Sequence, residues 1–324
     1  MSGTTTSPNP NIFGIQTGYG ANSNNASGYS GSTIALQSTG GGSITLTGRS
    51  GSTANKGISL NDISILSNSG LITVDGGANG VGFETYVYNA PPSNTRLVTL
   101  GSCAGCDATT VSAMGLLTSS SANISVIGDT VVGAGTSKID TTGSVSITSF
   151  GTSFSTAPTF PFTGLTLANT VSGLTIGKST NISAVTTLVM SVAGPVTVYG
   201  GAVSIGNALT TTGAGADVNI YSTTSTTSSG AITAGGSVNF NSTATTTVNG
   251  AVSAGAGINV IGTAPTMSGA LTAVGPIRIT PTGAITLNGN ITVTGAGNNL
   301  LAKTPSSITI ANGAAFQTNN GDMV

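Results

Sequence analysis

A short apolar phrase returns every 19 or 20 residues from Val218 to Val293, and this period constrains the fold more than any single motif does. The phrase appears as Val218-Asn219-Ile220, Val238-Asn239-Phe240, Ile258-Asn259-Val260 and Ile277-Arg278-Ile279. Two further sets recur at the same spacing, namely Ile232, Val252, Leu271 and Ile291, and Val248, Met267 and Leu287. Such self-similarity is typical of a chain that winds repeatedly around one axis, so that each turn contacts only its neighbours.

Within each phrase the apolar residues stand two apart, with Asn, Thr, Ser or Arg between them. This alternation is typical of a β-strand with one buried and one hydrated face. Three such strands per period, joined by Gly-, Asn- and Pro-containing turns, predict an all-β fold, a parallel β-helix with equivalent residues stacked. Each turn of the helix would then hold three strands and about 19–20 residues.

The alternation also divides the chain. Residues 1–30 are rich in Gly, Asn and Ser and form an N-terminal segment with little strand signal. Residues 31–324 are predicted to form the β-helix, with irregular excursions near 81–110 and 149–163, where aromatic residues and prolines replace the alternation. Late in the chain a longer turn, Gly295 to Asn299, precedes Leu301, Ile310 and Phe316, which are expected to continue the stack.

The charge content of the chain is low, with 7 Lys plus Arg and 8 Asp plus Glu in 324 residues, and no His. The basic residues stand singly, so the sequence predicts no nucleic-acid partner. No apolar run approaches the roughly 20 residues of a membrane span, so no membrane insertion of this segment is predicted. The first residues do not form a signal peptide, and Asn319 to Val324 resemble a turn entering another strand, so we expect a segment of a longer chain.

The two cysteines, Cys103 and Cys106, form the Cys-x-x-Cys motif of the chain. A redox motif of this kind opens a helix in a βαβ unit, and a zinc site needs two more ligands. Neither context is present, because the chain has no His and no further Cys. We therefore predict a loop-closing disulfide of an exported protein, and no metal site.

Four phenylalanines, Phe150, Phe154, Phe160 and Phe162, gather in the second irregular stretch. They are the candidate contact patch for a partner or a glycan. The alternative interpretation is that the rings fill a widened turn of the stack, since aromatic side chains are usually buried.

Catalytic groups are sparse. Asp107 and Asp129 are 22 residues apart and are the carboxylates that adjacent turns could bring together for acid–base work. Both stand in turn-like contexts, where Asp is common because it accepts backbone hydrogen bonds. The loop Gly173 to Ser179 has three residues between its glycines, whereas a phosphate-binding loop needs four, so no nucleotide cofactor is expected. The sequence favours a protein that is not an enzyme.

Several phrases resemble the repeats of filamentous-haemagglutinin-type bacterial large exoproteins. They are Gly283-Ala284-Ile285-Thr286-Leu287-Asn288-Gly289, Ser307-Ile308-Thr309-Ile310-Ala311-Asn312-Gly313 and Gly41-Gly42-Ser43-Ile44-Thr45-Leu46-Thr47-Gly48. The resemblance implies a right-handed β-helical shaft of a secreted or surface-displayed adhesin. Asn9-Pro10-Asn11 is similar to the export-domain motif of these proteins, but Ile12 replaces the usual Gly, so that domain is not assigned.

The expected function is therefore structural and adhesive, with a host-cell, bacterial or glycan surface as partner and no cofactor. A glycan-binding or polysaccharide-degrading β-helix is the main alternative. An ice-binding face is a third, because flat Thr arrays can order water, although the column Asn219, Asn239, Asn259 and Arg278 argues against it.

Overall fold

The computed structural model describes residues 2–4, 15–16, 34–51, 56–61, 63–84, 98–104, 106, 115–134 and 136–324. Their regular elements are β-strands, without a helix, and the strands pair in parallel. The described part of the chain is thus all-β and built from stacked parallel sheets, an arrangement consistent with a β-helix or solenoid. The chain forms two compact units, Met1–Ser172 (unit 1) and Gly173–Val324 (unit 2), which are described in turn.

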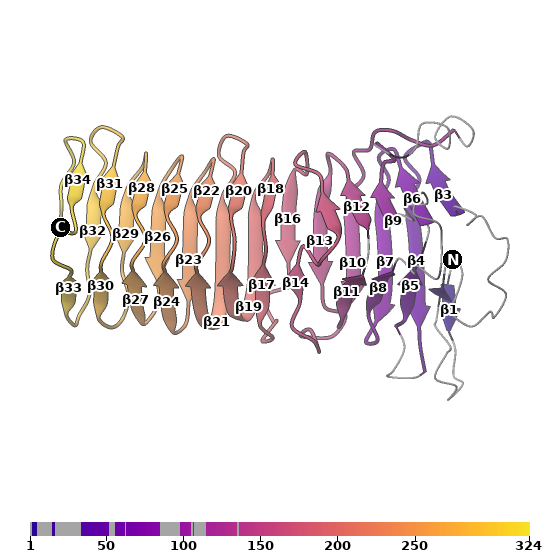
Figure 1. The fold of residues 1–324 in the computed structure, drawn as a ribbon, viewed down its shortest axis with the longest axis horizontal. Coiled ribbons are helices and arrows are strands. Elements are labelled where there is room, and N and C mark those ends of the chain that lie inside the picture. The colour runs from indigo at the N-terminus through magenta and orange to yellow at the C-terminus, as the bar shows by residue number, and fades with distance from the viewer. Residues whose placement is uncertain are drawn as a thin grey trace. The chain divides into compact units, whose positions relative to one another are not determined.

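Unit 2 contains three ladders, each formed by strands that follow one another at the period of the sequence. The first ladder comprises β16 (Gly173–Ile176), β19 (Val196–Ile205), β21 (Val218–Ser228), β23 (Val238–Ser242), β26 (Ile258–Ile261), β29 (Ile277–Ile279) and β32 (Leu300–Ala302). The second comprises β17 (Val185–Thr187), the second halves of β19 and β21, β24 (Thr245–Val248), β27 (Ala264–Met267), β30 (Ile285–Leu287) and β33 (Ile308–Ile310). The third comprises β18 (Met190–Val192), β20 (Leu209–Thr211), β22 (Ile232–Ala234), β25 (Val252–Ala254), β28 (Leu271–Ala273), β31 (Ile291–Val293) and β34 (Phe316–Thr318). Figure 1 shows the strands of this third ladder side by side in chain order.

The register of these ladders is the one that the repeated phrase predicts. Val218 pairs with Val238, Val238 with Ile258 and Ile258 with Ile277. All four side chains are fully buried, whereas the polar residues between the apolar ones face outward. Burial of such a side chain contributes about 1.5–3 kcal/mol, so a column of them stabilises every turn against its neighbours.

A column of glycines lies at one corner of unit 2. Gly230, Gly250, Gly269 and Gly289 precede the strands of the third ladder. A Cβ on Gly269 would lie 2.0 Å from the carbonyl oxygen of Gly250, and one on Gly289 would lie 2.3 Å from that of Gly269. Glycine is therefore required where the backbone of one turn rests directly on the backbone of the turn before it.

Unit 1 follows the same plan. One ladder comprises β1 (Ser2–Thr4), β4 (Ile44–Arg49), β7 (Ile72–Gly77), β10 (Ile124–Gly128) and β13 (Ser144–Thr148). A second comprises β2 (Ile15–Gln16), β5 (Ile58–Leu60), β8 (Val81–Glu84) and β11 (Val131–Ala134). A third comprises β3 (Ile34–Ser38), β6 (Ile63–Ser67), β9 (Val98–Gly101), β12 (Ser137–Asp140) and β15 (Leu165–Leu167), and the short strand β14 (Thr159–Phe160) precedes β15.

Three details refine the sequence-based expectations. The first irregular excursion contains two regular ladder strands, β8 and β9, while residues 85–97 and most of residues 1–30 lie outside the described residues. In the second excursion, residues 149–158 carry no strand. Leu301 lies on β32, which continues the stack, but Leu300 is the residue that pairs with Ile277 and is buried, whereas Leu301 pairs with the outward Arg278. A shift of one residue moves a strand side chain to the opposite face.

Within the part of the chain that the structure describes, no helix has the length and apolar character needed to cross a membrane.

The strand β26 offers a matched test of the stack. Ile258 is fully buried, whereas Ile261 on the same strand is 49% exposed. We expect Ile258→Ala to lower the free energy of unfolding by about 2–5 kcal/mol, because it leaves a cavity inside the stack. Ile261→Ala should change it by less than about 0.5 kcal/mol. Urea unfolding followed by circular dichroism measures both, and equal effects would contradict the assigned register.

Candidate functional site

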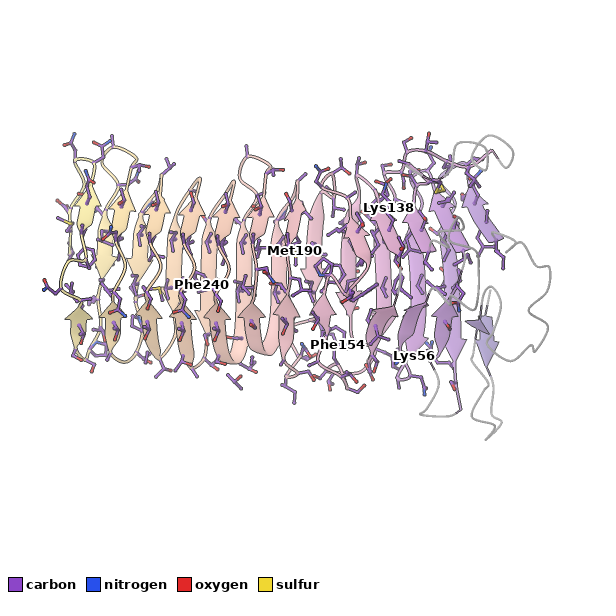
Figure 2. All side chains as sticks on the ribbon, in the orientation of Figure 1. Lys56, Lys138, Phe154, Met190 and Phe240 are labelled. Atoms are coloured by element: carbon purple, nitrogen blue, oxygen red, sulfur yellow. A yellow bond between two sulfur atoms is a disulfide. The ribbon has the colours of Figure 1, made fainter. Side chains whose placement is uncertain are left out.

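The structure joins Cys103 and Cys106 in a disulfide, seen as a yellow bond in Figure 2. Cys103 is buried against Leu66 and Leu116, and its amide donates to the carbonyl of Leu117. The disulfide therefore closes a short loop just after β9, and the packing of Cys103 holds that loop against the apolar residues of unit 1.

Two charged residues lie beside this disulfide loop. The Lys138 ammonium (Figure 2) donates to the carbonyl of Ala104 and lies 3.1 Å from a carboxylate oxygen of Asp140. That carboxylate also accepts a hydrogen bond of 2.8 Å from the Ser102 hydroxyl. Lys138 and Asp140 thus hold the loop in place, which is a structural role.

The four predicted contact-patch phenylalanines do not share one surface. Phe154, Phe160 and Phe162 are buried, and only Phe150 is exposed, at 48%. The Phe162 ring packs on Phe83 with centroids 5.0 Å apart. The guanidinium of Arg49 lies over the Phe150 ring, 4.8 Å from its centroid. The three buried rings fill the irregular stretch, the alternative interpretation given above, and do not offer a docking surface together with Phe150.

The carboxylate pair proposed for acid–base work is only half described, since Asp107 lies outside the described residues. Asp129 accepts a hydrogen bond of 2.6 Å from the amide of Gly151 through its side chain. The backbone carbonyl of Asp129 accepts from the amide of Ser155. Asp129 therefore fixes the turn that follows β13. Among the described residues, no group of three or more His, Cys, Asp or Glu side chains is placed to hold a metal ion.

Three columns of outward, mostly polar side chains run along unit 2, one on each ladder. The first contains Thr175, Thr197, Asn219, Asn239, Asn259, Arg278 and Leu301. The second, called here the hydroxyl column, contains Thr186, Ser204, Thr227, Thr247, Thr266, Thr286 and Thr309. The third contains Ser191, Thr210, Thr233, Ser253, Thr272, Thr292 and Gln317. In the first column the Asn239 amide donates to the Asn219 oxygen at 2.8 Å, and Asn259 donates to Asn239 at 2.7 Å.

A hollow lies on the surface of unit 2 where β19 and β21 turn from the first ladder into the second. The pairing shifts register after Gly200, where Gly201 stands opposite the two residues Thr223 and Thr224. A Cβ on Gly201 would lie 2.0 Å from the carbonyl oxygen of Ile182, so only glycine admits the approach of the preceding loop. This bulge bends the strands and re-aims the side chains beside it.

A buried asparagine fixes the loop that borders the bulge. Asn181 is only 1% exposed, and its amide donates to the carbonyl of Tyr199 at 2.9 Å. The amide of Gly201 donates to the carbonyl of Ser183 at 2.8 Å, which ties the same loop to β19. The stretch Gly173 to Ser179, whose glycine spacing differs from that of a phosphate-binding loop, leads into this loop. The loop forms one wall of the hollow.

Tyr199 and Tyr221 provide the aromatic part of the hollow. They are register partners on β19 and β21, with ring centroids 4.9 Å apart and ring planes inclined by 13°. The hollow has a volume of about 150 Å³. Beside the two rings its lining includes Ser179, Thr223, Asn241 and Thr243, all exposed. The lining contains no charged residue.

This hollow (the tyrosine hollow) was not anticipated from the sequence. A signal was present, because Tyr199 and Tyr221 follow Val198 and Ile220 at equivalent places of successive repeats. The volume and the composition of the lining had no such signal, since they depend on the bulge and on the packed loop. Chemically the hollow offers aromatic surface next to hydroxyl and amide groups, and its lining contains no Asp, Glu, His, Cys or Lys.

In comparisons with known proteins, no family model, no curated protein and no solved structure matches this chain.

The disulfide gives a direct chemical prediction. We expect the unfolded but unreduced protein to take up no maleimide, and the reduced protein to take up two per chain, because both cysteines are paired. Mass spectrometry of protein from an oxidising compartment measures this. Two maleimides on the unreduced chain would contradict the pairing.

Proposed function

We propose that this chain is a right-handed parallel β-helix with three strands per turn, and that it forms the structural and adhesive shaft of a secreted or surface-displayed bacterial exoprotein. The observation that carries the proposal is the set of three parallel ladders in unit 2, of which the third runs without a register shift from β18 to β34. The repeat phrases resemble those of filamentous-haemagglutinin-type proteins, which supports the adhesive assignment. A stack of this kind adds length turn by turn without requiring a new core.

Four aspartates hold turns or neighbouring strands in place, which supports the proposal that the protein is not an enzyme. Asp75 forms an ion pair of 2.7 Å with Arg49, and Asp140 pairs with Lys138. Asp217 accepts from the amide of Ser237 at 2.6 Å, in the way that Asp129 accepts from Gly151. Each of these groups fixes a turn or a neighbouring strand.

The outward columns support contact with surfaces rather than with nucleic acid. They consist mostly of Thr, Ser and Asn, with Arg278 as the one cation among the three columns of unit 2. Neutralising several phosphates requires clustered cations. Neutral hydroxyl and amide groups in columns suit contact with another polar surface, such as that of a host cell, a bacterium or a glycan.

Attachment is the test of this proposal. Beads coated with the folded chain are expected to bind host cells, bacteria or glycan-coated surfaces above the level of beads coated with the same chain after unfolding. The unfolded chain is the matched control because its composition is identical. The adhesive assignment fails if the two kinds of bead bind equally on every surface tested.

A second candidate function is supported by the hydroxyl column. Its seven members form an unbroken row of Thr and Ser, which the first column does not. Neighbouring hydroxyls stand about 4.8 Å apart, and β-branched Thr side chains are held in few rotamers. Within unit 2 these hydroxyls show no internal hydrogen bond. A fixed periodic row of this kind is suited to ordering water on an ice surface.

Thermal hysteresis, the difference between the melting and freezing temperatures of a solution, tests ice binding by the hydroxyl column. We expect Thr247→Tyr to abolish any hysteresis of the parent chain, because the bulky ring interrupts the hydroxyl column. Asn239→Tyr places the same ring in the first column and should leave hysteresis unchanged. A parent chain without hysteresis, or equal loss in both variants, excludes ice binding by the hydroxyl column.

A further inference from the structure

We infer that the tyrosine hollow is a binding site for one residue of a neutral saccharide. This inference deepens the proposed attachment function and rests on it for its biological setting, because it names the chemical class of the partner. The inference rests on the two stacked rings, on the uncharged polar side chains around a mostly apolar hollow, and on the hydrogen-bonded walls.

The rings stand in an outward column of the first ladder that continues with Asn241 and then with the exposed Ile261. Tyr221 pairs with Asn241 on its far side and remains 37% exposed, although Tyr199 stacks against it. A tyrosine pair of this kind offers apolar ring surface with polar hydroxyls at its edge. The C–H faces of a pyranose ring match such a surface, while its hydroxyls require polar partners around the rim.

The rim provides those partners. Thr223, Thr243 and Ser179 carry hydroxyls, which donate and accept, and Asn241 carries an amide with both capacities. A phosphate or sulfate would meet no cation in the lining, whereas the hydroxyls of a sugar would find donors and acceptors among these exposed groups. The set therefore favours a neutral ligand rich in hydroxyl groups.

The walls are fixed before any ligand arrives. Asn181 holds the bordering loop through the carbonyl of Tyr199, and the hydroxyl of Thr243 donates to the carbonyl of Thr223 on the neighbouring strand. A site that is already ordered loses less conformational entropy on binding.

The volume of the hollow limits both the size of the ligand and its affinity. Its volume of about 150 Å³ is below the roughly 300 Å³ of small drug-binding pockets. It suits one sugar residue of a longer glycan, with a Kd on the order of 1 mM for a single site. Many copies displayed on one surface would raise the overall avidity.

The test uses the full chain and four neutral oligosaccharides, namely cellohexaose, maltohexaose, mannohexaose and chitohexaose, with a sulfated heparin hexasaccharide as the charged probe. Saturation-transfer NMR detects contact between sugar protons and the protein at millimolar affinity. We expect transfer to at least one neutral probe. Tyr221→Ala should weaken that binding by about tenfold, because it removes the exposed ring.

Three further variants define the site. Asn241→Arg places a long side chain in the hollow without altering either ring and should also weaken binding by about tenfold, so it decides the matter if Tyr221→Ala does not fold. Tyr221→Phe keeps the ring and should stay within about threefold of the parent. Phe150→Ala is the matched control, because it removes an exposed aromatic ring from unit 1.

The inference is overturned if no neutral probe binds, if only the sulfated probe binds, or if Asn241→Arg binds as the parent does. It is also overturned if Phe150→Ala weakens binding as much as Tyr221→Ala. Bead attachment separates this result from the proposed function: beads carrying Asn241→Arg that still attach would leave the adhesive function standing without this site.

Discussion

In-register parallel pairing of backbones is the constraint on which the rest of this structure depends. Within unit 2, β23 pairs with β21 one period before and β26 one period after, and β26 pairs in the same way with β23 and β29. Pairing in register places equivalent residues directly over one another, so most inward positions are apolar in successive turns, and the polar residues buried among them are small, such as Thr226 and Thr246. The same stacking brings backbone against backbone at the corners, where Gly250, Gly269 and Gly289 leave room for the carbonyl of the turn before.

The outward positions are free of this requirement, and there the chain carries its distinguishing chemistry. The Asn219, Asn239 and Asn259 side chains use the stacking to hydrogen-bond along their column. The hydroxyl column repeats one small polar side chain without using it internally. The tyrosine hollow arises where the register is interrupted, since the bulge after Gly200 separates two runs of regular pairing. Regular stacking thus produces mostly polar columns, and the local register shift between β19 and β21 produces a concave site.

Much of the fold was predictable because side-chain alternation and period both act locally. The pairs Val248 with Met267 and Met267 with Leu287 follow from spacing alone. Leu300 and Leu301 show the limit, because two adjacent leucines after a lengthened turn leave the register open, and only the pairing with Ile277 selects Leu300. The site was harder to predict. Phe154, Phe160 and Phe162 resembled a surface patch in sequence, but irregular backbone created interior space that their rings fill.

The sequence by itself determined the all-β character, the period, the parallel ladders of unit 2 and the inward residues, since each is recorded in the spacing of apolar side chains. The tertiary structure alone decided which aromatic rings are exposed, how Asn181 closes the loop against Tyr199, and that Tyr199 and Tyr221 border a hollow with Asn241 and Thr243. The physical reason is that burial and concavity are properties of neighbours brought together from different turns. A spacing along the chain specifies which residues can meet, but the bulges, glycine contacts and loop hydrogen bonds of the folded stack determine the space left between them.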